Sequence, residues 1–350
     1  CVYLHMTLIK SISGIRGTIG GSIENNLTPI DAVNFGCAYA KWLIKKKSNS
    51  KNKVIIGRDA RVSGKMIQNL VQSSLLSMGI NVIDLGLSTT PTVELMVKKY
   101  NADGGIIITA SHNPKEWNAL KLLNKNGEFL NSDEGEEVID FYEKKKFKFS
   151  KVNKLGTLSK LKNSINQHIK SVLNLELVKT KKIKSKKLKI VVDAVNSTGG
   201  IIIPKLLKKL NIDVVELYCN PNGDFPHNPE PLKKNLKDLS QKVTECGADM
   251  GIAVDPDVDR LVFMCENGEI FGEENTLVAC ADYVLSKTPG STVSNLSSSI
   301  ALRDITKKHN QSHFYSAVGE VNVVEKMKKV NAVIGGEGNG GVIYPESHYG

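Results

Sequence analysis

Residues 105–114 read Gly-Ile-Ile-Ile-Thr-Ala-Ser-His-Asn-Pro, an apolar run that ends in a small polar turn. A short run of this kind is typical of a strand buried on both faces of a parallel sheet. In open α/β folds, residues just beyond the carboxyl end of such a strand lie at the mouth of the sheet, where ligands bind. Ser111 is therefore a candidate nucleophile or phosphate carrier. The alternative is that Ser111 or Asn113 merely caps a turn.

The residues around Ser111 favour chemistry over a turn cap. His112 follows directly, and Asn118 and Lys121 come a few positions later. A lysine this close supplies a mobile cation that pairs with phosphate or moves a proton. We therefore predict catalytic roles for Ser111, His112 and Lys121, and a substrate contact for Asn118.

Strands and helices alternate along the whole chain. The pattern predicts strands at 53–56, 80–85 and 104–109 with helices at 64–78 and 91–100, which is the alternation of a mixed α/β sheet. It recurs with strands at 188–192, 213–218 and 249–254, and with helices at 274–285, 298–308 and 320–329. The prediction is an α/β protein of three consecutive similar mixed-sheet domains, residues 1–150, 151–258 and 259–350, around a central cleft.

A group of carboxylates follows the apolar strand at 250–254. Residues 255–260 read Asp-Pro-Asp-Val-Asp-Arg, and the spacing of two lets several oxygens turn toward one hard cation. Oxygen ligands alone favour Mg²⁺ over zinc. A calcium loop of the EF-hand type fits poorly, because its sixth position is Arg260 in place of glycine and residues 261–264 read as a strand. A solvated acidic turn is the remaining alternative.

A glycine-rich segment lies near the end of the sequence. Residues 335–341 read Gly-Gly-Glu-Gly-Asn-Gly-Gly after a short apolar run, and they contain a G-x-G-x-x-G pattern. That pattern indicates dinucleotide binding only if a helix follows, whereas residues 342–345 read as a returning strand. We therefore predict a hairpin that presents Glu337 and Asn339 to a ligand. A carboxylate such as Glu337 suits sugar hydroxyls.

Composition is consistent with an enzyme. The chain has 350 residues, is 41% hydrophobic and has no uninterrupted apolar run of membrane length, so we expect two or three packed domains in a soluble, cytoplasmic protein. Cysteines at 1, 37, 219, 246, 265 and 280 show no metal-binding spacing, and we expect reduced, buried thiols.

The formal charge of +11 raises the question of nucleic acid binding. The lysine runs have no interleaved aromatic residues, and aromatic content is only 6%, so a nucleic acid partner is not expected. The positive field would instead help to steer anionic small molecules.

These segments together resemble the α-D-phosphohexomutase superfamily. Two further segments carry the likeness, namely residues 13–17, Ser-Gly-Ile-Arg-Gly, and residues 57–61, Gly-Arg-Asp-Ala-Arg. The resemblance implies that Ser111 is phosphorylated in the resting enzyme. It also implies that one Mg²⁺ per chain is held by a phosphoserine oxygen and by the carboxylates of Asp255, Asp257 and Asp259.

The resemblance extends to the residues that would surround the substrate. Arg16 and Lys121 match basic residues near the transferring phosphoryl group, with Lys121 as the proton acceptor, and Arg260 matches the arginine beside the metal. Glu337 matches a glutamate that binds sugar hydroxyls. Asn339 departs from the family, because many relatives have serine there, but its amide still forms hydrogen bonds.

The implied reaction interconverts hexose 6-phosphate and hexose 1-phosphate through a bound bisphosphate, with a hexose bisphosphate as activator. The motifs look most like those of phosphoglucosamine mutases and of phosphomannomutase/phosphoglucomutases. We expect glucosamine 6-phosphate as substrate, with mannose or glucose phosphate as the alternative. The expected partner is a small sugar phosphate, without nucleic acid or membrane, and the expected assembly is a monomer or a homodimer.

One part of the family pattern is not found in these 350 residues. Relatives add a fourth domain with an Arg-x-Ser-Gly-Thr-like loop that grips the non-reacting phosphate. The sequence is therefore expected to be either a piece of a longer protein or a truncated chain that binds Mg²⁺ and sugar phosphate without turnover.

Overall fold

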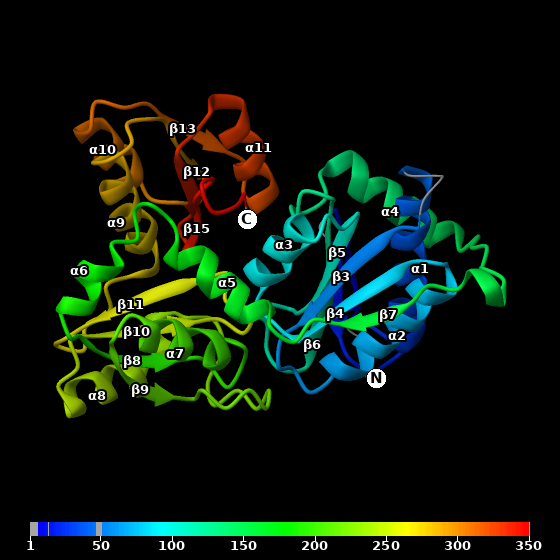
Figure 1. The fold of residues 1–350 in the computed structure, drawn as a ribbon, viewed down its shortest axis with the longest axis horizontal. Coiled ribbons are helices and arrows are strands. Elements are labelled where there is room, and N and C mark those ends of the chain that lie inside the picture. The colour runs from blue at the N-terminus through cyan, green and yellow to red at the C-terminus, as the bar shows by residue number, and fades with distance from the viewer. Residues whose placement is uncertain (1–5, 13, 47–50, 350) are drawn as a thin grey trace. The chain divides into compact units, whose positions relative to one another are not determined.

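The computed structural model describes residues 6–12, 14–46 and 51–349. These residues form three β-sheets with their associated helices, distributed over two compact units (Figure 1). The first unit contains the described residues up to Ser164 together with Asn222–Asp224, and the second contains Ile165–Pro221 and the residues from Phe225 onward.

The first unit has a seven-stranded sheet in the order β1-β2-β6-β5-β3-β4-β7. Strands β3, β4 and β5 are parallel, and β6 returns antiparallel to β5. The strands are β1 Ile9–Ser11, β2 Gly14–Thr18, β3 Lys53–Arg58, β4 Asn81–Leu87, β5 Gly104–Ile108, β6 Trp117–Leu123 and β7 Leu158–Lys160. The helices are α1 Pro29–Lys46, α2 Gly64–Ser77, α3 Thr90–Lys99 and α4 Ser132–Lys144, followed by the short 3₁₀ turn η1 Val152–Lys154.

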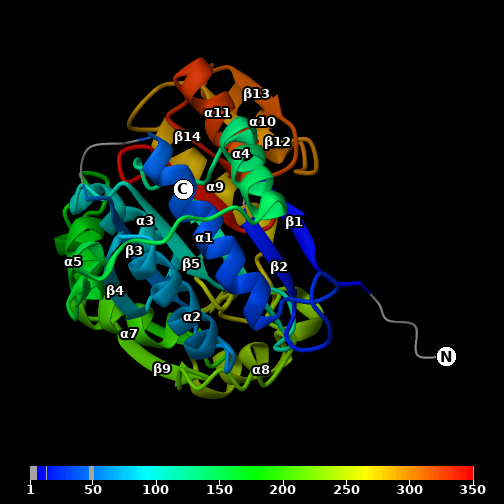
Figure 2. The ribbon, with the colours of Figure 1, turned by 90° about the vertical axis from the view of Figure 1, so that its right-hand side faces the viewer.

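Strand β5 is buried along its whole length, as the apolar run predicts. Ile106 and Ile108 pack on the face that also receives residues of α1 and α2, while Ile107 packs on the opposite face with residues of α3. Helices α1 and α2 lie side by side across the sheet (Figure 2). Burial of each isoleucine side chain contributes roughly 1.5–3 kcal/mol, so the strand that precedes Ser111 is firmly anchored.

The second unit contains two four-stranded sheets, in the orders β11-β10-β8-β9 and β13-β12-β14-β15. The first has strands β8 Lys189–Asp193, β9 Asp213–Leu217, β10 Met250–Val254 and β11 Leu261–Cys265, with helices α5 Ser164–Leu173, α6 Thr180–Ser185, α7 Gly199–Lys209 and α8 Lys237–Cys246 and the 3₁₀ turn η2 Lys233–Asn235. The second has strands β12 Thr292–Asn295, β13 His313–Ser316, β14 Ile334–Glu337 and β15 Gly341–Ile343, with helices α9 Glu273–Leu285, α10 Ala301–Lys308 and α11 Glu320–Val330.

One topology recurs in all three sheets. Each contains three parallel strands and a fourth strand that returns as the antiparallel partner of the third, in the spatial orders β6-β5-β3-β4, β11-β10-β8-β9 and β15-β14-β12-β13. The loop between the third and fourth strands is therefore structurally equivalent in each repeat. These three loops carry Ser111, the aspartates at 255–259, and Asn339, which lies two residues after Glu337 at the end of β14. The prediction of three similar mixed-sheet α/β domains is confirmed.

The predicted domain boundaries need correction at two places. Strand β11 pairs with β10 over five residues, from Val254↔Leu261 to Met250↔Cys265. Residues 261–265 therefore belong to the second sheet, and the predicted boundary at residue 258 is wrong. Strand β7 pairs with β4, so the first unit continues past residue 150. In both cases the error has one cause: an apolar run indicates a strand but does not identify its partner.

The cysteine prediction holds in part. Among the described residues, cysteines 37, 219, 246, 265 and 280 are free thiols, as expected. Only Cys37 is fully buried, and the other four are half-buried, so the expectation that all are buried is wrong; Cys1 lies outside the described residues. Burial raises the pKa of the Cys219 thiol to about 12, which disfavours the reactive thiolate.

No helix within residues 6–12, 14–46 and 51–349 combines the length and the apolar character needed to span a bilayer.

Candidate active site

Ser111 sits in a tight turn directly beyond β5. Its φ is 46°, in the left-handed region that serine rarely adopts, and its backbone N–H donates to the Thr109 hydroxyl at 2.9 Å. The Asn113 N–H donates to the Ala110 carbonyl at 3.0 Å and closes the turn. The Ser111 hydroxyl lies 3.4 Å from Nδ1 of His112. Strained backbone of this kind costs about 1–3 kcal/mol and is concentrated at functional sites.

A buried arginine stabilises this turn through hydrogen bonds to its backbone carbonyls. Arg61 is 1% exposed, and its guanidinium donates to Asp59 and to four backbone carbonyls of the serine loop. The carbonyl acceptors are Ser111 at 2.5 Å, Asn113 at 2.6 Å, Pro114 at 2.6 Å and Trp117 at 3.0 Å. The planar fork of arginine suits such a cluster of acceptors, which a lysine would contact as a single point charge.

Asp59 neutralises this arginine and also contacts the loop. Its Oδ2 lies 3.0 Å from Nε of Arg61 and accepts a hydrogen bond from the Thr109 hydroxyl at 2.7 Å. Neither Asp59 nor Arg61 was predicted as a site residue, although both lie in the quoted Gly-Arg-Asp-Ala-Arg segment. Two opposite charges directly after a buried strand were the available signal, because such charges are buried only as a pair.

The predicted basic residues of the first unit lie on two neighbouring strands. Arg16 of β2 is paired with Ala119 of β6, and Lys121 lies two positions further along β6, so both side chains share one face of the sheet. Nη1 of Arg16 is 3.5 Å from Oδ1 of Asn113, which places it at the serine loop. Nζ of Lys121 lies 5.6 Å from the ring centroid of Phe129.

Asn118 has a different environment from the one expected of a substrate ligand. It is fully buried, and its amide donates to the Ser63 hydroxyl at 2.9 Å while its Oδ1 accepts from the Ala119 N–H at 2.8 Å. In this structure its polar atoms are therefore engaged with the protein.

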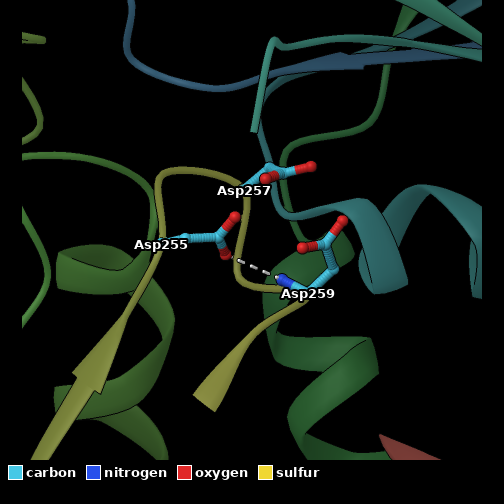
Figure 3. A group of neighbouring side chains, drawn as sticks. All are labelled: Asp255, Asp257 and Asp259. Carbon is cyan, nitrogen blue, oxygen red and sulfur yellow. Dashed lines mark hydrogen bonds between the residues drawn. The ribbon is translucent and has the colours of Figure 1, made fainter. Parts of the chain in front are cut away.

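The three aspartates of the second repeat converge, as Figure 3 shows. Each contributes a carboxylate oxygen, and these oxygens all lie within 4.8 Å of one another. Oδ1 of Asp255 accepts the backbone N–H groups of Asp259 and Arg260, both at 3.2 Å, which curls the loop around that carboxylate. Val258 completes the curl with a φ of 64°.

Two hydroxyls brace the aspartate loop against the start of α7. Ser197 and Thr198 both donate to the Pro256 carbonyl at 2.7 Å. These two hydrogen bonds fix the position of Pro256 relative to the start of α7.

The chemistry of the three carboxylates fits a magnesium ion. Asp255 and Asp257 are fully buried and Asp259 is half-buried, and three adjacent anions in such a place repel one another strongly unless a cation lies among them. A purely oxygen donor set with few protein ligands is the kind that Mg²⁺ takes, because Mg²⁺ keeps several positions for water or phosphate. The residues that would hold it are Asp255, Asp257 and Asp259.

The third repeat forms the predicted hairpin. Strands β14 and β15 are antiparallel, with Gly336 opposite Val342 and Glu337 opposite Gly341. The glycines are therefore followed by a strand and not by the helix that dinucleotide binding requires, which excludes that alternative. Oε1 of Glu337 accepts from the Asn295 amide at 2.5 Å and from the Gly319 N–H at 3.0 Å. Asn339 accepts the Gly341 N–H at 3.0 Å.

Glu337 and Asn339 open into a pocket of about 240 Å³ within the second unit. Its charged lining is four glutamates and one arginine, Glu230, Glu273, Glu274, Glu337 and Arg260. Nη1 of Arg260 lies 3.6 Å from the Glu230 carboxylate. The pocket therefore combines hydrogen-bonding groups for a polyol with an excess of negative charge. It brings together three predicted residues, Glu337, Asn339 and Arg260.

Three α/β repeats whose equivalent loops carry a strained serine, a carboxylate cluster and a glutamate hairpin define the class, the α-D-phosphohexomutase superfamily. The domain descriptions of one family match in order: phosphoglucomutase/phosphomannomutase alpha/beta/alpha domain I over residues 8–149, domain II over 166–268 and domain III over 273–350. The chain belongs to the phosphoglucomutase/phosphomannomutase family.

Individual relatives agree with this assignment. A phosphoglucomutase/phosphomannomutase of Thermococcus kodakarensis is 38% identical over 334 residues, covering 94% of this chain and 72% of the relative. A protein of Pyrococcus abyssi named "Probable phosphoglucosamine mutase" is 35% identical over 336 residues, covering 95% of this chain and 70% of the relative.

Solved structures share the fold. A phosphoglucomutase/phosphomannomutase family protein of Burkholderia thailandensis superposes with a TM-score of 0.82 at 23% identity, covering 100% of this chain and 74% of the other. The phosphoglucomutase parafusin of Paramecium superposes with a TM-score of 0.77 at 19% identity, covering 96% of this chain and 66% of the other.

Proposed function

We propose that the protein interconverts hexose 6-phosphate and hexose 1-phosphate through a phosphoserine at Ser111. The phosphoryl group leaves the Ser111 oxygen and bonds to the free hydroxyl of the sugar monophosphate, which gives a bound bisphosphate. After the bisphosphate turns round, its other phosphate returns to Ser111. The strained turn and the Arg61 contacts support this role, because phosphoryl transfer depends on exact positioning of the reacting oxygen.

The other predicted residues take defined parts in this proposal. Lys121 accepts the proton of the attacking hydroxyl. His112 within the serine loop and Arg16 beside it contact the moving phosphoryl group. Asp255, Asp257 and Asp259 hold one Mg²⁺, which when bound offsets negative charge on the transferred group. A hexose bisphosphate activates the enzyme by phosphorylating Ser111. The cytoplasmic location and the monomeric or homodimeric state remain predictions.

The preferred substrate in this proposal is glucosamine 6-phosphate, which is converted to glucosamine 1-phosphate. The observation that carries this choice is the acidic lining of the sugar pocket, with four glutamates against one arginine. A protonated 2-amino group is attracted by that lining, whereas the neutral 2-hydroxyl of glucose or mannose gains only hydrogen bonds. The relatives named phosphoglucosamine mutase agree with this choice.

An alternative substrate has support of its own. The Thermococcus relative named phosphoglucomutase/phosphomannomutase, at 38% identity, favours glucose or mannose phosphate as substrate.

Comparison of substrates tests the proposal. The purified protein, given Mg²⁺ and glucose 1,6-bisphosphate, is assayed with the 6-phosphates of glucosamine, glucose and mannose. We expect kcat/KM for glucosamine 6-phosphate to be about tenfold or more above the others, since one charge-assisted contact is worth roughly that factor. Faster turnover of glucose or mannose phosphate contradicts the substrate choice, and binding without turnover of any of the three contradicts the mutase activity.

A further inference from the structure

Each repeat has a buried Asp or Asn where its first parallel strand ends. Asp59 follows β3, Asp193 ends β8 and Asn295 ends β12, and their exposed fractions are 0%, 1% and 2%. In the first repeat this residue holds the serine loop through Thr109 and Arg61, and in the third it holds Glu337 directly. The equivalent position in the second repeat therefore raises the question of what Asp193 holds.

Asp193 holds a histidine from a distant segment. Its Oδ2 lies 3.0 Å from Nε2 of His227, while its Oδ1 accepts the Val195 N–H at 3.0 Å. Nδ1 of His227 lies 2.8 Å from the Asn228 carbonyl. Both ring nitrogens therefore face acceptors, and only the doubly protonated imidazolium donates to both. The geometry assigns a positive charge to His227.

The groups around His227 favour the same charge. The Tyr218 ring meets the imidazole edge-on with centroids 5.8 Å apart, and the Tyr218 hydroxyl donates to Asp238 at 2.6 Å. The anions facing His227 are thus Asp193 from β8 and Asp238 from α8. Burial by itself lowers the pKa of His227, but the hydrogen bond and charge of Asp193 outweigh burial, so the pKa lies above its ordinary value.

His227 belongs to residues 225–232, which we call the Glu230 loop. Three prolines, at 226, 229 and 231, restrict its backbone. Oδ1 of Asn228 accepts the Glu230 N–H at 3.0 Å, and the Asn235 amide donates to the Glu230 carbonyl at 2.8 Å. Only three residues beyond His227, Glu230 reaches Arg260 and the sugar pocket, which Pro231 and Leu232 also line.

We propose that Asp193 and His227 are a positioning pair for the sugar pocket. Their ion pair fixes one end of the Glu230 loop to the end of β8, so that Glu230 and Arg260 keep the geometry that binds the sugar phosphate. Neither residue lines the pocket, and both act through Glu230. The inference rests on the proposed function only for the identity of the molecule that fills the pocket.

A second histidine–aspartate pair in the same unit provides a matched control. Nε2 of His309 lies 2.7 Å from Asp282, and neither residue lines the pocket. The test compares His227→Ala, His227→Gln and His309→Ala in the full chain. Thermal unfolding is used to check that each variant is folded. If His227→Ala does not fold, His227→Gln replaces it in the comparison, because the glutamine amide still donates a hydrogen bond to Asp193.

We expect His227→Ala to raise KM for glucosamine 6-phosphate about tenfold with a smaller change in kcat, since a charged hydrogen bond is lost. His227→Gln should restore KM to within about threefold of the parent protein, because the donor to Asp193 is retained. His309→Ala should leave KM unchanged. An equal effect of the two alanine variants on KM overturns the proposal.

The pH dependence separates positioning from simple packing. In the parent protein KM should be low while His227 is protonated and should rise as pH passes its pKa, whereas His227→Gln should show no such rise. The pKa of His227, measured by NMR and identified by the signal that His227→Gln removes, should exceed 6.5. A pKa at or below that value overturns the proposal.

The NMR titration needs no turnover, so it stands even if the mutase activity fails. In that case calorimetric binding of glucosamine 6-phosphate replaces KM as the readout, with the same expected order of variants. An affinity that His227→Ala and His309→Ala change equally again overturns the proposal.

Discussion

Ser111 depends on residues that sequence patterns reveal only in part. The apolar run before it and the polar turn around it predict an exposed functional position at the end of a strand. The Arg61 side chain that binds four carbonyls of the turn lies 50 positions away from Ser111 in the sequence. Its role follows from the neighbouring placement of β3 and β5, and a single sequence does not show which strands are neighbours.

Replacing Arg61 tests its contribution to the fold of the serine loop. Arg61→Met keeps an unbranched side chain but removes the ion pair of Arg61 with the buried Asp59 carboxylate and the donor that Arg61 supplies to four carbonyls. We expect the free energy of unfolding, measured in urea, to fall by about 3–5 kcal/mol. The exposed pair of Arg303 with Asp304 is the control, and Arg303→Met should leave the free energy of unfolding essentially unchanged. Equal losses in the two variants would refute the loop-holding role.

The aspartate cluster is testable at the same scale through metal binding. Asp255→Asn removes one of the three neighbouring carboxylate charges while keeping the hydrogen-bond acceptor for the backbone N–H groups of Asp259 and Arg260. We expect the Mg²⁺ dissociation constant, measured by calorimetry, to rise at least ~10-fold, and chelation by EDTA to lower the melting temperature of the parent protein. If Mg²⁺ changes neither heat nor melting temperature in the parent protein, the cluster is not a metal site.

The antiparallel pairs β5–β6, β10–β11 and β14–β15 occupy equivalent places in the three repeats, and the loop of each pair carries predicted site residues. Each signature loop could be found from the sequence, because an apolar run followed by polar residues at a strand end is a local pattern. The structural equivalence of the three loops could not be found from the sequence. It depends on β6, β11 and β15 each pairing antiparallel with the strand that precedes it. The same limit explains why β11 was assigned to the wrong domain.

The third hairpin depends on close contact between its two strands. A Cβ on Gly336 would lie 2.1 Å from the Gly341 carbonyl oxygen, so Gly336→Ala forces β14 and β15 apart and moves Glu337. Gly247 at the end of α8 has a φ of 59° but open space around it, which makes Gly247→Ala a control for backbone strain alone.

We expect Gly336→Ala to weaken binding of glucosamine 6-phosphate at least ~10-fold and to lose about 2 kcal/mol more stability than Gly247→Ala, whose strain costs ~1 kcal/mol. Calorimetry and urea unfolding measure the two effects. Unchanged sugar-phosphate affinity in Gly336→Ala would mean that the hairpin does not form the binding pocket.

The stability of the second unit should depend on pH through a histidine far from the proposed chemistry. His168 of α5 is 8% exposed, and burial together with the nearby His348 lowers its pKa to about 4. The unfolded chain binds this proton near pH 6.5, so the folded state loses stability as pH falls from 6.5 toward 4 and is unaffected above 6.5.

His168→Gln should remove up to ~3 kcal/mol of this acid sensitivity, because glutamine does not titrate. The measurement is the melting temperature of both proteins at pH 7, 6, 5 and 4. A parallel decline in the two proteins over this range would show that other groups cause the acid sensitivity.

Across the whole molecule, the predicted architecture of three α/β repeats is correct, and the family is established by matches along residues 8–350. Hydrophobic periodicity carried that prediction, because buried strands and amphipathic helices are local patterns. The pocket lined by Glu230 and Arg260 could not be predicted from the sequence. These two residues are 30 positions apart, and the pocket also includes Glu337 and Asn339 of the β14–β15 hairpin, which belongs to another sheet.

The proposed mutase reaction requires a phosphate on Ser111, and this modification can be measured. After incubation with glucose 1,6-bisphosphate and Mg²⁺, mass spectrometry should locate one phosphate on Ser111, and subsequent addition of glucosamine 6-phosphate should remove it. Ser111→Ala protein should take up none. Phosphate on a different residue, or equal uptake by the Ser111→Ala protein, would show that Ser111 is not the phosphate carrier.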